Sequence, residues 1–324
     1  MKEKIIGSLQ GIAIGDAFGL GLEFKSRHWI QKNVLFDTFL DARTAGPEIE
    51  PGTYSDDTEH TIGVIEALLS SEEFSKDLLL EKFKDEYEND LQKKGFPRAG
   101  HGSIEKWYTG KKTIEEVRAM QAEREDPGNA PVMRALPLCF IDKGDVYRYA
   151  CINADATHPH ELGRQASFLT VLTAWHFLRE DGDRDDLIDF LLGFVGNTQQ
   201  KIILQKIDKL PKPKLLTQED YRVLHGVQPL PYIKWDTNIY GMPCAAMKTA
   251  LNVVYVMKHA ESAFDALKIS INMGGDVDSL AAVCTGIASG KYGNESLPDF
   301  LFAQTEGLER LADLGSQLHT KYFA

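Results

Sequence analysis

Apolar residues recur every three to four positions along most of the chain, and this spacing constrains the fold more than any other feature. One-sided apolar faces, which are typical of amphipathic helices, occur in segments 5–13, 62–69, 168–175 and 280–287. The same pattern predicts helices over 74–94, 114–123, 184–194, 244–258 and 261–270. Alternating strand-like runs are almost absent. We therefore expect an all-α fold, with many helices around a common core rather than a simple four-helix bundle.

Two stretches interrupt this helical pattern. Residues 25–54 are irregular and are expected to form a long connection. Residues 205–235 are rich in lysine and proline, which predicts an exposed insertion. Because the motifs described below lie on both sides of that insertion, we interpret residues 1–324 as one domain.

Composition excludes several classes of protein. A chain of 324 residues can bury a large core without disulfides, and its four cysteines are too scattered for a zinc signature. The formal charge of −12 argues against a general nucleic-acid-binding surface but not against a small anionic ligand. The apolar run near the N-terminus is interrupted by Gln10 and Asp16, and no stretch approaches a membrane-spanning length. We expect a cytoplasmic protein without membrane partners.

Two short acidic blocks each precede a helical run: SDDT at 55–58 and GGDVDS at 274–279. Either block alone is explained as a helix N-cap, since Asp56 and Glu59 have the spacing of a capping box and Ser279 is a good cap before a helix near Leu280. Capping needs only one acceptor, so the second aspartate of each block is surplus. The glycine pair before Asp276 also provides backbone freedom that a cap does not require.

The surplus carboxylates indicate a metal site if the two helix starts converge. Asp56, Asp57, Asp276 and Asp278 would then bring a charge of about −4 into one pocket, where they would repel one another without cations. Two divalent ions would neutralise this charge. Oxygen ligands without thiolates favour magnesium, manganese or calcium over zinc. Spacing alone does not show that the blocks converge.

The sequence resembles the ADP-ribosylglycohydrolases, the family of the dinitrogenase-reductase-activating glycohydrolase and of the arginine- and serine-linked ADP-ribosyl hydrolases. Four blocks carry the resemblance, in the family's order: GIAIGDAFG at 11–19, YSDDT at 54–58, GNAPVMR at 128–134 and GGDVDS at 274–279. Weaker matches are RAGHG at 98–102 and TH at 157–158. Three positions depart from the family's pattern: Ser279 replaces a threonine, His60 a methionine and Ala130 a glycine.

This resemblance implies a compact multi-helix fold with two magnesium ions at helix N-termini, manganese being an alternative ion. The metal ligands that it implies are Ser55, Asp56, Asp57, Asp276, Asp278 and Ser279. The residues that it implies for substrate binding are Gly100, Gly102, Gly128, Asn129 and His158. Each of the glycines also fits an ordinary turn.

Glu23 and Asp57 are the expected catalytic residues. Sequence alone favours a solvent-facing role for Glu23 at a helix end, whereas the resemblance places a glutamate here beside the metals, where partial burial would raise its pKa. Asp57 is the alternative proton-transfer group. Asp16 is interpreted as structural, for example hydrogen-bonded within its own turn. Arg134 fits either a phosphate contact or a structural ion pair, and it is left out of the site.

The predicted activity is magnesium-dependent hydrolysis of the bond between ADP-ribose and a modified macromolecule, with a protein side chain as the favoured carrier. Small ADP-ribose derivatives are also candidate substrates. One rival is a non-catalytic binding or structural protein of the same fold, like a lens crystallin that resembles this family; it would have lost metal ligands, and none is lost here. Another is a metal phosphohydrolase, but the adjacent His-Asp pair typical of one such class is absent.

Overall fold

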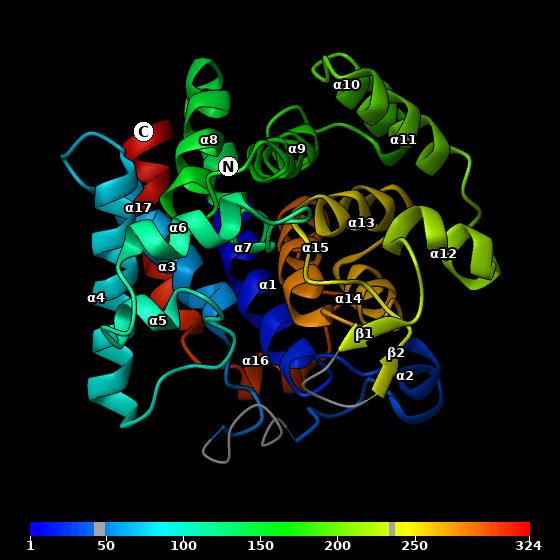
Figure 1. Cartoon of the computed structure of the whole chain (residues 1–324), viewed down its shortest axis with the longest axis horizontal. Coiled ribbons are helices and arrows are strands. Elements are labelled where there is room, and N and C mark those ends of the chain that lie inside the picture. Colours follow the sequence, from blue (N-terminus) through cyan, green and yellow to red (C-terminus); the bar gives the residue numbers. More distant parts are fainter. Residues whose placement is uncertain (42–48, 233–236) are drawn as a thin grey trace.

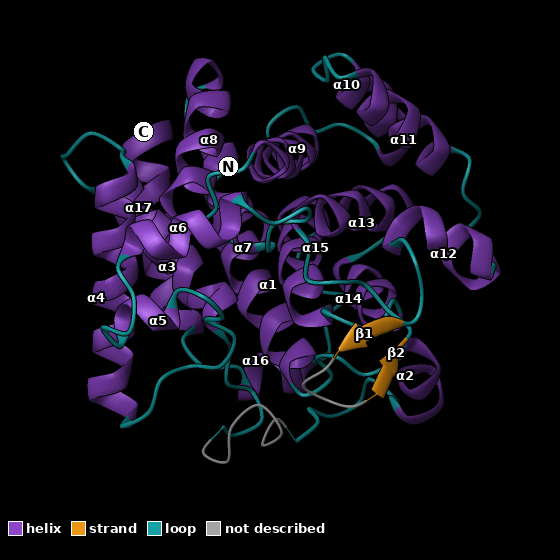
Figure 2. Ribbon diagram, in the orientation of Figure 1, coloured by secondary structure: helices purple, strands orange, loops and turns teal. Residues whose placement is uncertain are grey.

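The computed structural model describes residues 1–41, 49–232 and 237–324, and it is mostly helical with very little strand (Figure 2). The longer helices are α1 (Lys2–Leu20), α3 (Asp56–Leu69), α4 (Lys76–Lys94), α8 (Val146–Thr157), α9 (Glu161–Leu178), α11 (Thr198–Asp208), α13 (Ala246–His259), α14 (Ala263–Asn272), α15 (Val277–Tyr292) and α17 (Leu308–Phe323). This architecture confirms the predicted all-α class.

Short elements connect these helices. The shorter α-helices are α2 (Arg27–Asn33), α5 (Glu105–Tyr108), α6 (Ile114–Ala122), α7 (Ala130–Met133), α10 (Leu187–Leu192), α12 (Gln218–His225) and α16 (Asp299–Gln304). The 3-10 turns are η1 (Leu136–Phe140), η2 (Lys143–Asp145), η3 (Arg184–Asp186) and η4 (Pro213–Leu215). Strands β1 (Leu230–Tyr232) and β2 (Thr237–Ile239) pair antiparallel, with Leu230 opposite Ile239.

Helices α1 and α15 lie side by side at the centre of the molecule (Figure 1). Both are apolar around most of their circumference, which is the pattern of helices buried on all sides; nearly all residues from Ile5 to Leu20 and from Val277 to Gly290 are buried. Helices α9, α13, α14 and α17 pack around this pair. Because α15 starts in the second acidic block, the central packing fixes the position of that block.

The connection over 25–54 contains one element that the sequence did not predict. Helix α2 forms within it, and only Arg27 and Ile30 of its seven residues are buried. Such a short helix has too few buried positions to produce a helical period in the sequence. Residues 42–48 of this connection lie outside the described residues.

The segment 205–235 contains the end of α11, then η4, α12 and β1, and its residues 233–235 are not described. Several of its apolar side chains, including Ile207, Leu210, Tyr221 and Leu224, join the main core. The segment is therefore more ordered and more buried than its composition suggests. That it forms an insertion in a single domain of 1–324 stays a prediction.

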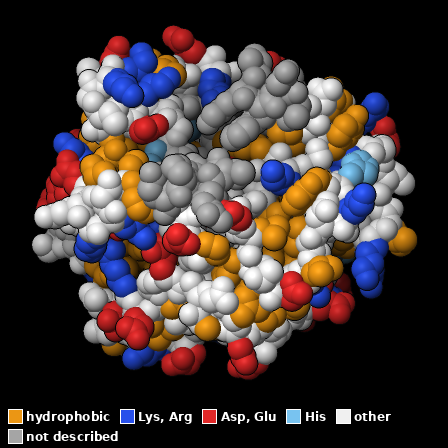
Figure 3. Space-filling view, turned by 90° about the horizontal axis from the view of Figure 1, so that it is seen from below, with side chains coloured by type: hydrophobic (Ala, Val, Ile, Leu, Met, Phe, Trp, Pro, Cys, Tyr) orange, Lys and Arg blue, Asp and Glu red, His pale blue; other side chains and the backbone are white. Residues whose placement is uncertain are grey.

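Within the described parts of the chain, no helix has the length and apolar character needed to span a bilayer. Among the described residues, no disulfide joins Cys139, Cys151, Cys244 or Cys284. On the face seen from below, basic and acidic side chains are interspersed rather than separated by sign (Figure 3).

Candidate metal centre and substrate pocket

The first acidic block begins helix α3, and its cap is Ser55. The Ser55 hydroxyl accepts a hydrogen bond from the backbone N–H of Asp57 at 3.2 Å. The N-cap is therefore not Asp56, and the capping box that the spacing of Asp56 and Glu59 suggested is not formed; Glu59 instead pairs with His101. Both aspartates are thus left available for another role.

Asp16, near the C-terminal end of α1, holds this block in place. Its carboxylate accepts hydrogen bonds from the backbone N–H groups of Ser55 (2.9 Å) and Thr58 (3.0 Å) and from the Thr58 hydroxyl (2.6 Å). The expectation that Asp16 bonds within its own turn is therefore wrong. The residue is structural, but it acts on a helix start about forty positions further along the chain.

The second block begins helix α15, with Asp276 as the N-cap residue, a little earlier than the predicted start near Leu280. Gly274 and Gly275 have φ values of 69° and 79°, the left-handed region that the glycine pair predicted. The Gly275 carbonyl accepts from Phe24 N–H at 2.7 Å, and Gly275 N–H donates to the Lys25 carbonyl at 2.9 Å. These bonds anchor the chain next to Glu23 against the second block.

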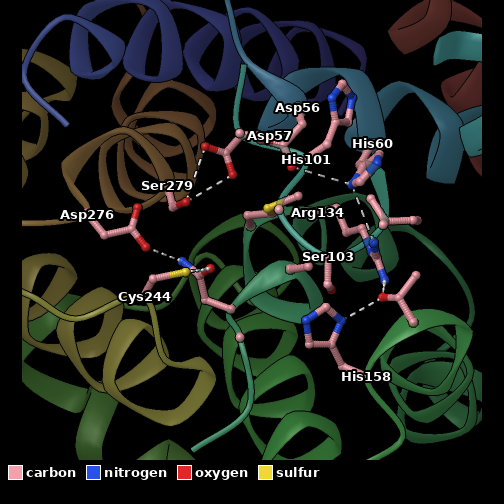
Figure 4. Close-up of a pocket in the computed structure, with 18 of the residues that line it drawn as sticks. Asp56, Asp57, His60, His101, Ser103, Arg134, His158, Cys244, Asp276 and Ser279 are labelled. Atoms are coloured by element: carbon pink, nitrogen blue, oxygen red, sulfur yellow. Dashed lines mark hydrogen bonds and ion pairs between the residues drawn. The ribbon is translucent and has the colours of Figure 1, made fainter. Parts of the chain in front are cut away.

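The two blocks converge. The Ser279 hydroxyl from α15 lies 3.1 and 3.2 Å from the two carboxylate oxygens of Asp57 on α3 and donates to them (Figure 4). Glu23, Asp276 and Asp278 each place a carboxylate oxygen within 4.8 Å of the other two. Asp56 lines the same pocket. The condition on which the metal prediction depended is therefore met.

The convergence has a clear electrostatic effect. Burial raises the pKa of Asp56 to about 7, with Glu59, Asp16 and Asp276 adding to the shift and His101 opposing it. Burial also raises the pKa of Asp276, and it raises those of Asp57 and Asp278 well above the usual range, where neighbouring carboxylates add to the effect. Carboxylates held this close resist ionisation unless cations compensate their charge.

The donor set fits divalent ions that prefer oxygen. Among the described residues, Asp278 Oδ1 is buried and has no hydrogen-bond partner, which is a costly state for an acceptor unless a ligand or ion binds it. Carboxylate oxygens of Glu23 and Asp276 lie within 4.8 Å of an Asp278 oxygen, and carboxylate sets of this kind suit magnesium, manganese or calcium. Of the six predicted ligands, Asp56, Asp57, Asp276, Asp278 and Ser279 line the pocket, whereas Ser55 lies behind Asp57 and donates to it at 3.3 Å.

Every residue predicted to bind substrate lines the same pocket: Gly100, Gly102, Gly128, Asn129 and His158. Gly100 is required by its surroundings, because it has a φ of 101° and a side chain there would overlap the Asp56 carboxylate. Asn129 links the predicted substrate-binding residues to the second acidic block, since its amide nitrogen donates to Asp276 Oδ2 at 2.8 Å. The Asn129 amide oxygen accepts from the Cys244 thiol at 3.0 Å (Figure 4).

The structure adds pocket residues that the sequence analysis left out. They include His60, His101, Ser103, Gln121, Arg134, Thr157 and Cys244. Arg134 is fully buried and bonds to Asn153 and Thr157, which are neutral, so the expected structural ion pair is not what holds it. Arg134, Thr157 and His101 lay within quoted motifs and could have been found there, whereas Cys244 and Gln121 had no signal in the sequence.

A mostly helical fold that brings two acidic helix starts together at a glycine-lined pocket defines a class of proteins with a candidate site for divalent metal ions. A profile of the ADP-ribosylglycohydrolase family matches residues 1–323. The chain therefore belongs to the ADP-ribosylglycohydrolase family, and it is a hydrolytic enzyme of that family.

Individual relatives agree with this assignment. The chain is 24% identical over 356 residues to ADP-ribosylhydrolase ARH3 of Homo sapiens, covering 97% of this chain and 92% of the relative. It is 23% identical over 326 residues to ADP-ribosylarginine hydrolase Tri1 of Serratia proteamaculans, covering 98% and 79%. A solved structure described as an ADP-ribosylglycohydrolase-related protein complex superposes with a TM-score of 0.68 at 18% identity, covering 99% of each chain, which supports the fold.

Proposed function

We propose that this enzyme is a magnesium-dependent hydrolase that cleaves the bond joining the distal ribose of ADP-ribose to a modified macromolecule. The observation that carries the proposal is the convergence of Asp57 and Ser279, which lie 222 residues apart in the sequence, at one buried acidic pocket. Both an ADP-ribosylarginine hydrolase and ADP-ribosylhydrolase ARH3 are among the relatives. An ADP-ribosylated protein is the favoured substrate, and O-acetyl-ADP-ribose or modified nucleic acid are further carriers to test.

Six residues would hold two magnesium ions, with manganese as an alternative: Ser55, Asp56, Asp57, Asp276, Asp278 and Ser279. When bound, the ions would chelate ribose hydroxyls, neutralise the carboxylates and favour deprotonation of water. Ser55 would contribute mainly by orienting Asp57, because its hydroxyl donates to that carboxylate.

The chain's own residues would orient the sugar and move the proton. Water adds to the anomeric carbon while the bond to the leaving nitrogen or oxygen breaks, and the leaving atom gains a proton. Glu23 faces the pocket beside Asp276 and Asp278, where its carboxyl group could deliver that proton or accept one from water. Asp57 is the second acid–base candidate. Surrounding carboxylates would stabilise the electron-poor sugar.

The remaining residues would hold the rest of ADP-ribose. Gly100, Gly102 and Gly128 allow the backbone to approach a ligand closely, as glycine-rich loops do at phosphates. Asn129 and His158 add side-chain polar groups. Arg134 and His60 line the same pocket and add nitrogen groups to it.

A magnesium titration that follows both melting and ADP-ribose release tests the proposal. At an ion concentration ~100 times the dissociation constant, each independent site should stabilise the fold by about 2.7 kcal/mol, a shift of a few degrees in a chain of this size. The Asp276→Asn variant should show a smaller shift and no turnover. Asp37→Asn, which makes the same change at an exposed residue outside the pocket, is the control.

The substrates for that assay should be arginine-, serine- and nucleic-acid-linked ADP-ribose and O-acetyl-ADP-ribose. If Asp276→Asn lost the magnesium shift but kept full activity, the metal would be structural and the proposed mechanism wrong. No release from any of these substrates by the wild-type enzyme with magnesium would contradict the proposed function itself.

A further inference from the structure

A buried chain of three side chains leads from Arg134 to the wall of the pocket. Arg134 follows helix α7, Thr157 is the last residue of α8, and His158 is the residue after it. Arg134 Nη2 donates to Thr157 Oγ1 at 2.8 Å, and Thr157 Oγ1 lies 2.8 Å from His158 Nδ1. All three residues are buried. Figure 4 shows this connection below His60, with Arg134 and His158 labelled.

The hydrogen-bonding capacity of these groups fixes the direction of each bond. A guanidinium group only donates, so Thr157 Oγ1 accepts from Arg134. If His158 Nδ1 also carried a proton, Thr157 would accept twice, and its own hydroxyl proton would have no acceptor among the contacts of the described residues. A buried hydroxyl proton without an acceptor is costly. Thr157 therefore donates to Nδ1, and the proton of His158 is on Nε2.

The Nε2 atom faces the substrate side of the pocket. His158 lines the pocket together with Gly128, and a side-chain carbon on Gly128 would lie 2.9 Å from Nε2. Burial lowers the pKa of His158 well below its usual value, and the charges of Arg134 and Arg124 lower it further. The ring therefore stays neutral at physiological pH and presents one N–H donor to the pocket.

Arg134 is itself held rigidly, so it can fix Thr157. Its Nε donates to Asn153 Oδ1 at 2.8 Å, and its Nη2 donates to the Asn153 carbonyl at 2.9 Å. Its guanidinium carbon lies 4.4 Å from the centre of the Phe83 ring. Because the guanidinium group is held on several sides, it has a single orientation. Its N–H therefore always approaches Thr157 Oγ1 from the same side, and the hydroxyl proton of Thr157 points towards His158.

We propose that Thr157 is a positioning residue, which transmits the fixed orientation of Arg134 to His158 and so holds the imidazole as an Nε2–H donor to an oxygen atom of ADP-ribose. The identity of the ligand rests on the proposed function, whereas the relay rests on the three side chains alone. Thr157 does not act on the reacting bond in this scheme. Its effect is on how well the ligand is bound and aligned.

Replacing Thr157 by valine and by serine tests the relay. Valine has nearly the same shape without the hydroxyl, so Thr157→Val should weaken ADP-ribose binding by ~10- to 100-fold, as expected when one hydrogen bond to a charged or polar oxygen is lost. Thr157→Ser keeps the hydroxyl and should bind nearly as well as the wild type. Isothermal titration with ADP-ribose measures both affinities.

Thr173→Val is the matched control, because Thr173 is also a buried helical threonine and its hydroxyl donates to the Leu169 carbonyl away from the pocket. This variant should bind ADP-ribose like the wild type. Melting temperatures of all variants report any general loss of stability.

A second measurement, made without ligand, reads the tautomer directly. Long-range proton–nitrogen NMR on protein labelled with ¹⁵N-histidine distinguishes a proton on Nδ1 from one on Nε2. The chain has nine histidines, so His158→Gln identifies the signal of His158. We expect an Nε2–H tautomer in the wild type and in Thr157→Ser, and a mixture or the Nδ1–H tautomer in Thr157→Val.

The two measurements separate the alternatives. An Nδ1–H tautomer in the wild type, or an unchanged tautomer in Thr157→Val, would overturn the relay even if affinity fell. A changed tautomer with unchanged affinity would overturn the role of the Nε2 donor in binding. If the wild type did not bind ADP-ribose at all, the proposed function and the ligand would be wrong, while the tautomer would still decide the relay.

Discussion

The position of Glu23 in the fold indicates a different role from the one that its sequence context suggests. In the sequence it follows a long apolar helix and fits a solvent-facing end. In the structure it is only partly buried, and its carboxylate lies within 4.8 Å of oxygens from Asp276 and Asp278. Two backbone hydrogen bonds explain this position, because Phe24 and Lys25 each bond to Gly275 in the second acidic block. Glu23 therefore belongs to the acidic group without being part of either acidic motif.

The role proposed for Glu23 predicts a loss of turnover without a loss of binding. Glu23→Gln keeps the shape and polarity of the side chain but cannot exchange a proton, so kcat should fall by ~10²-fold or more. ADP-ribose affinity should remain near the wild-type value. Steady-state kinetics and titration measure the two quantities, with Glu72→Gln at an exposed position as control. If Glu23→Gln had wild-type turnover, another group would have to transfer the proton, and Asp57 would be the first candidate.

Single residues also show where prediction from sequence stops. The two acidic blocks, the glycine pair at 274–275 and the Thr157-His158 pair carry local signals, and all were identified. The partners of Asp16 are about forty positions away, and His101 pairs with Glu59 across a similar gap. Contacts of this kind depend on how helices pack, and no local spacing encodes them. Long-range packing therefore decides what each motif residue contacts.

Among the elements, the pairing of α1 with α15 has the strongest sequence signature. Gly7, Gly11, Gly15 and Gly19 recur every fourth position on α1 and form one stripe along it. Each of these glycines approaches α15 so closely that a side-chain carbon would contact α15 atoms. Residues four apart lie on one face of a helix, so the stripe lets the two backbones meet. The second acidic block depends on this contact because it starts α15.

Gly15→Ala tests that dependence. The added methyl group would overlap the Ala281 carbonyl on α15, and neither backbone can move without disturbing the centre of the core. Overpacking of this kind typically costs about 1–3 kcal/mol or more. We therefore expect a lower free energy of unfolding and weaker magnesium binding, since Asp278 and Ser279 would shift with α15. Urea denaturation and a magnesium titration measure the two effects.

Gly144→Ala is the matched control, because a methyl group there meets no atom within 4 Å. It should change neither quantity. If Gly15→Ala were as stable as the wild type and bound magnesium equally well, the close contact between the helices would not be what holds the second block.

At this scale the sequence predicted some of the long helices closely and missed others. The predicted helices over 74–94 and 114–123 correspond to α4 and α6, with ends that differ by at most two residues. Helices α8, α11 and α17, of 12, 11 and 16 residues, were not predicted. Helix α2 and the β1–β2 pair were missed as well. Seven or fewer residues with few buried positions leave no period to detect, and pairing between two three-residue strands depends on the packing around them.

For the whole molecule, the segment over 205–235 matters because it packs against two distant parts of the chain. The Arg27 guanidinium on α2 lies 4.0 Å from the ring centre of Tyr221 on α12 and donates to Gln218. The Tyr255 hydroxyl on α13 donates to the Pro211 carbonyl at 2.7 Å. Helices α2, α12 and α13 are thereby joined through this segment, and α2 and α12 lie at the right of the molecule in Figure 1.

A buried histidine at this junction predicts how stability depends on pH. His225 at the end of α12 bonds through Nε2 to Asn252 Oδ1 at 3.1 Å, and no partner of its Nδ1 lies among the described residues. Burial lowers the pKa of His225 to about 3, and the charges of Arg27 and Lys248 lower it further, against the opposing bond to Asn252. The folded protein therefore keeps His225 neutral at pH values where an unfolded chain protonates it.

The depressed pKa fixes the sign of the effect. Since the unfolded histidine has a pKa of about 6.5, the contribution of neutral His225 to stability is present above that pH and is lost as the pH falls towards 3. Linkage gives a loss of about 2 kcal/mol between about pH 7.5 and pH 5 from this one residue. His225→Gln retains a donor for Asn252 but does not titrate. Between about pH 7.5 and pH 5 the free energy of unfolding of this variant should therefore fall by about 2 kcal/mol less than that of the wild type. Urea denaturation at the two pH values measures the difference, and only the change with pH is compared, because glutamine can alter the absolute stability. Equal losses in both proteins would mean that His225 is protonated in the folded state without penalty, and that α12 opens to water at this junction.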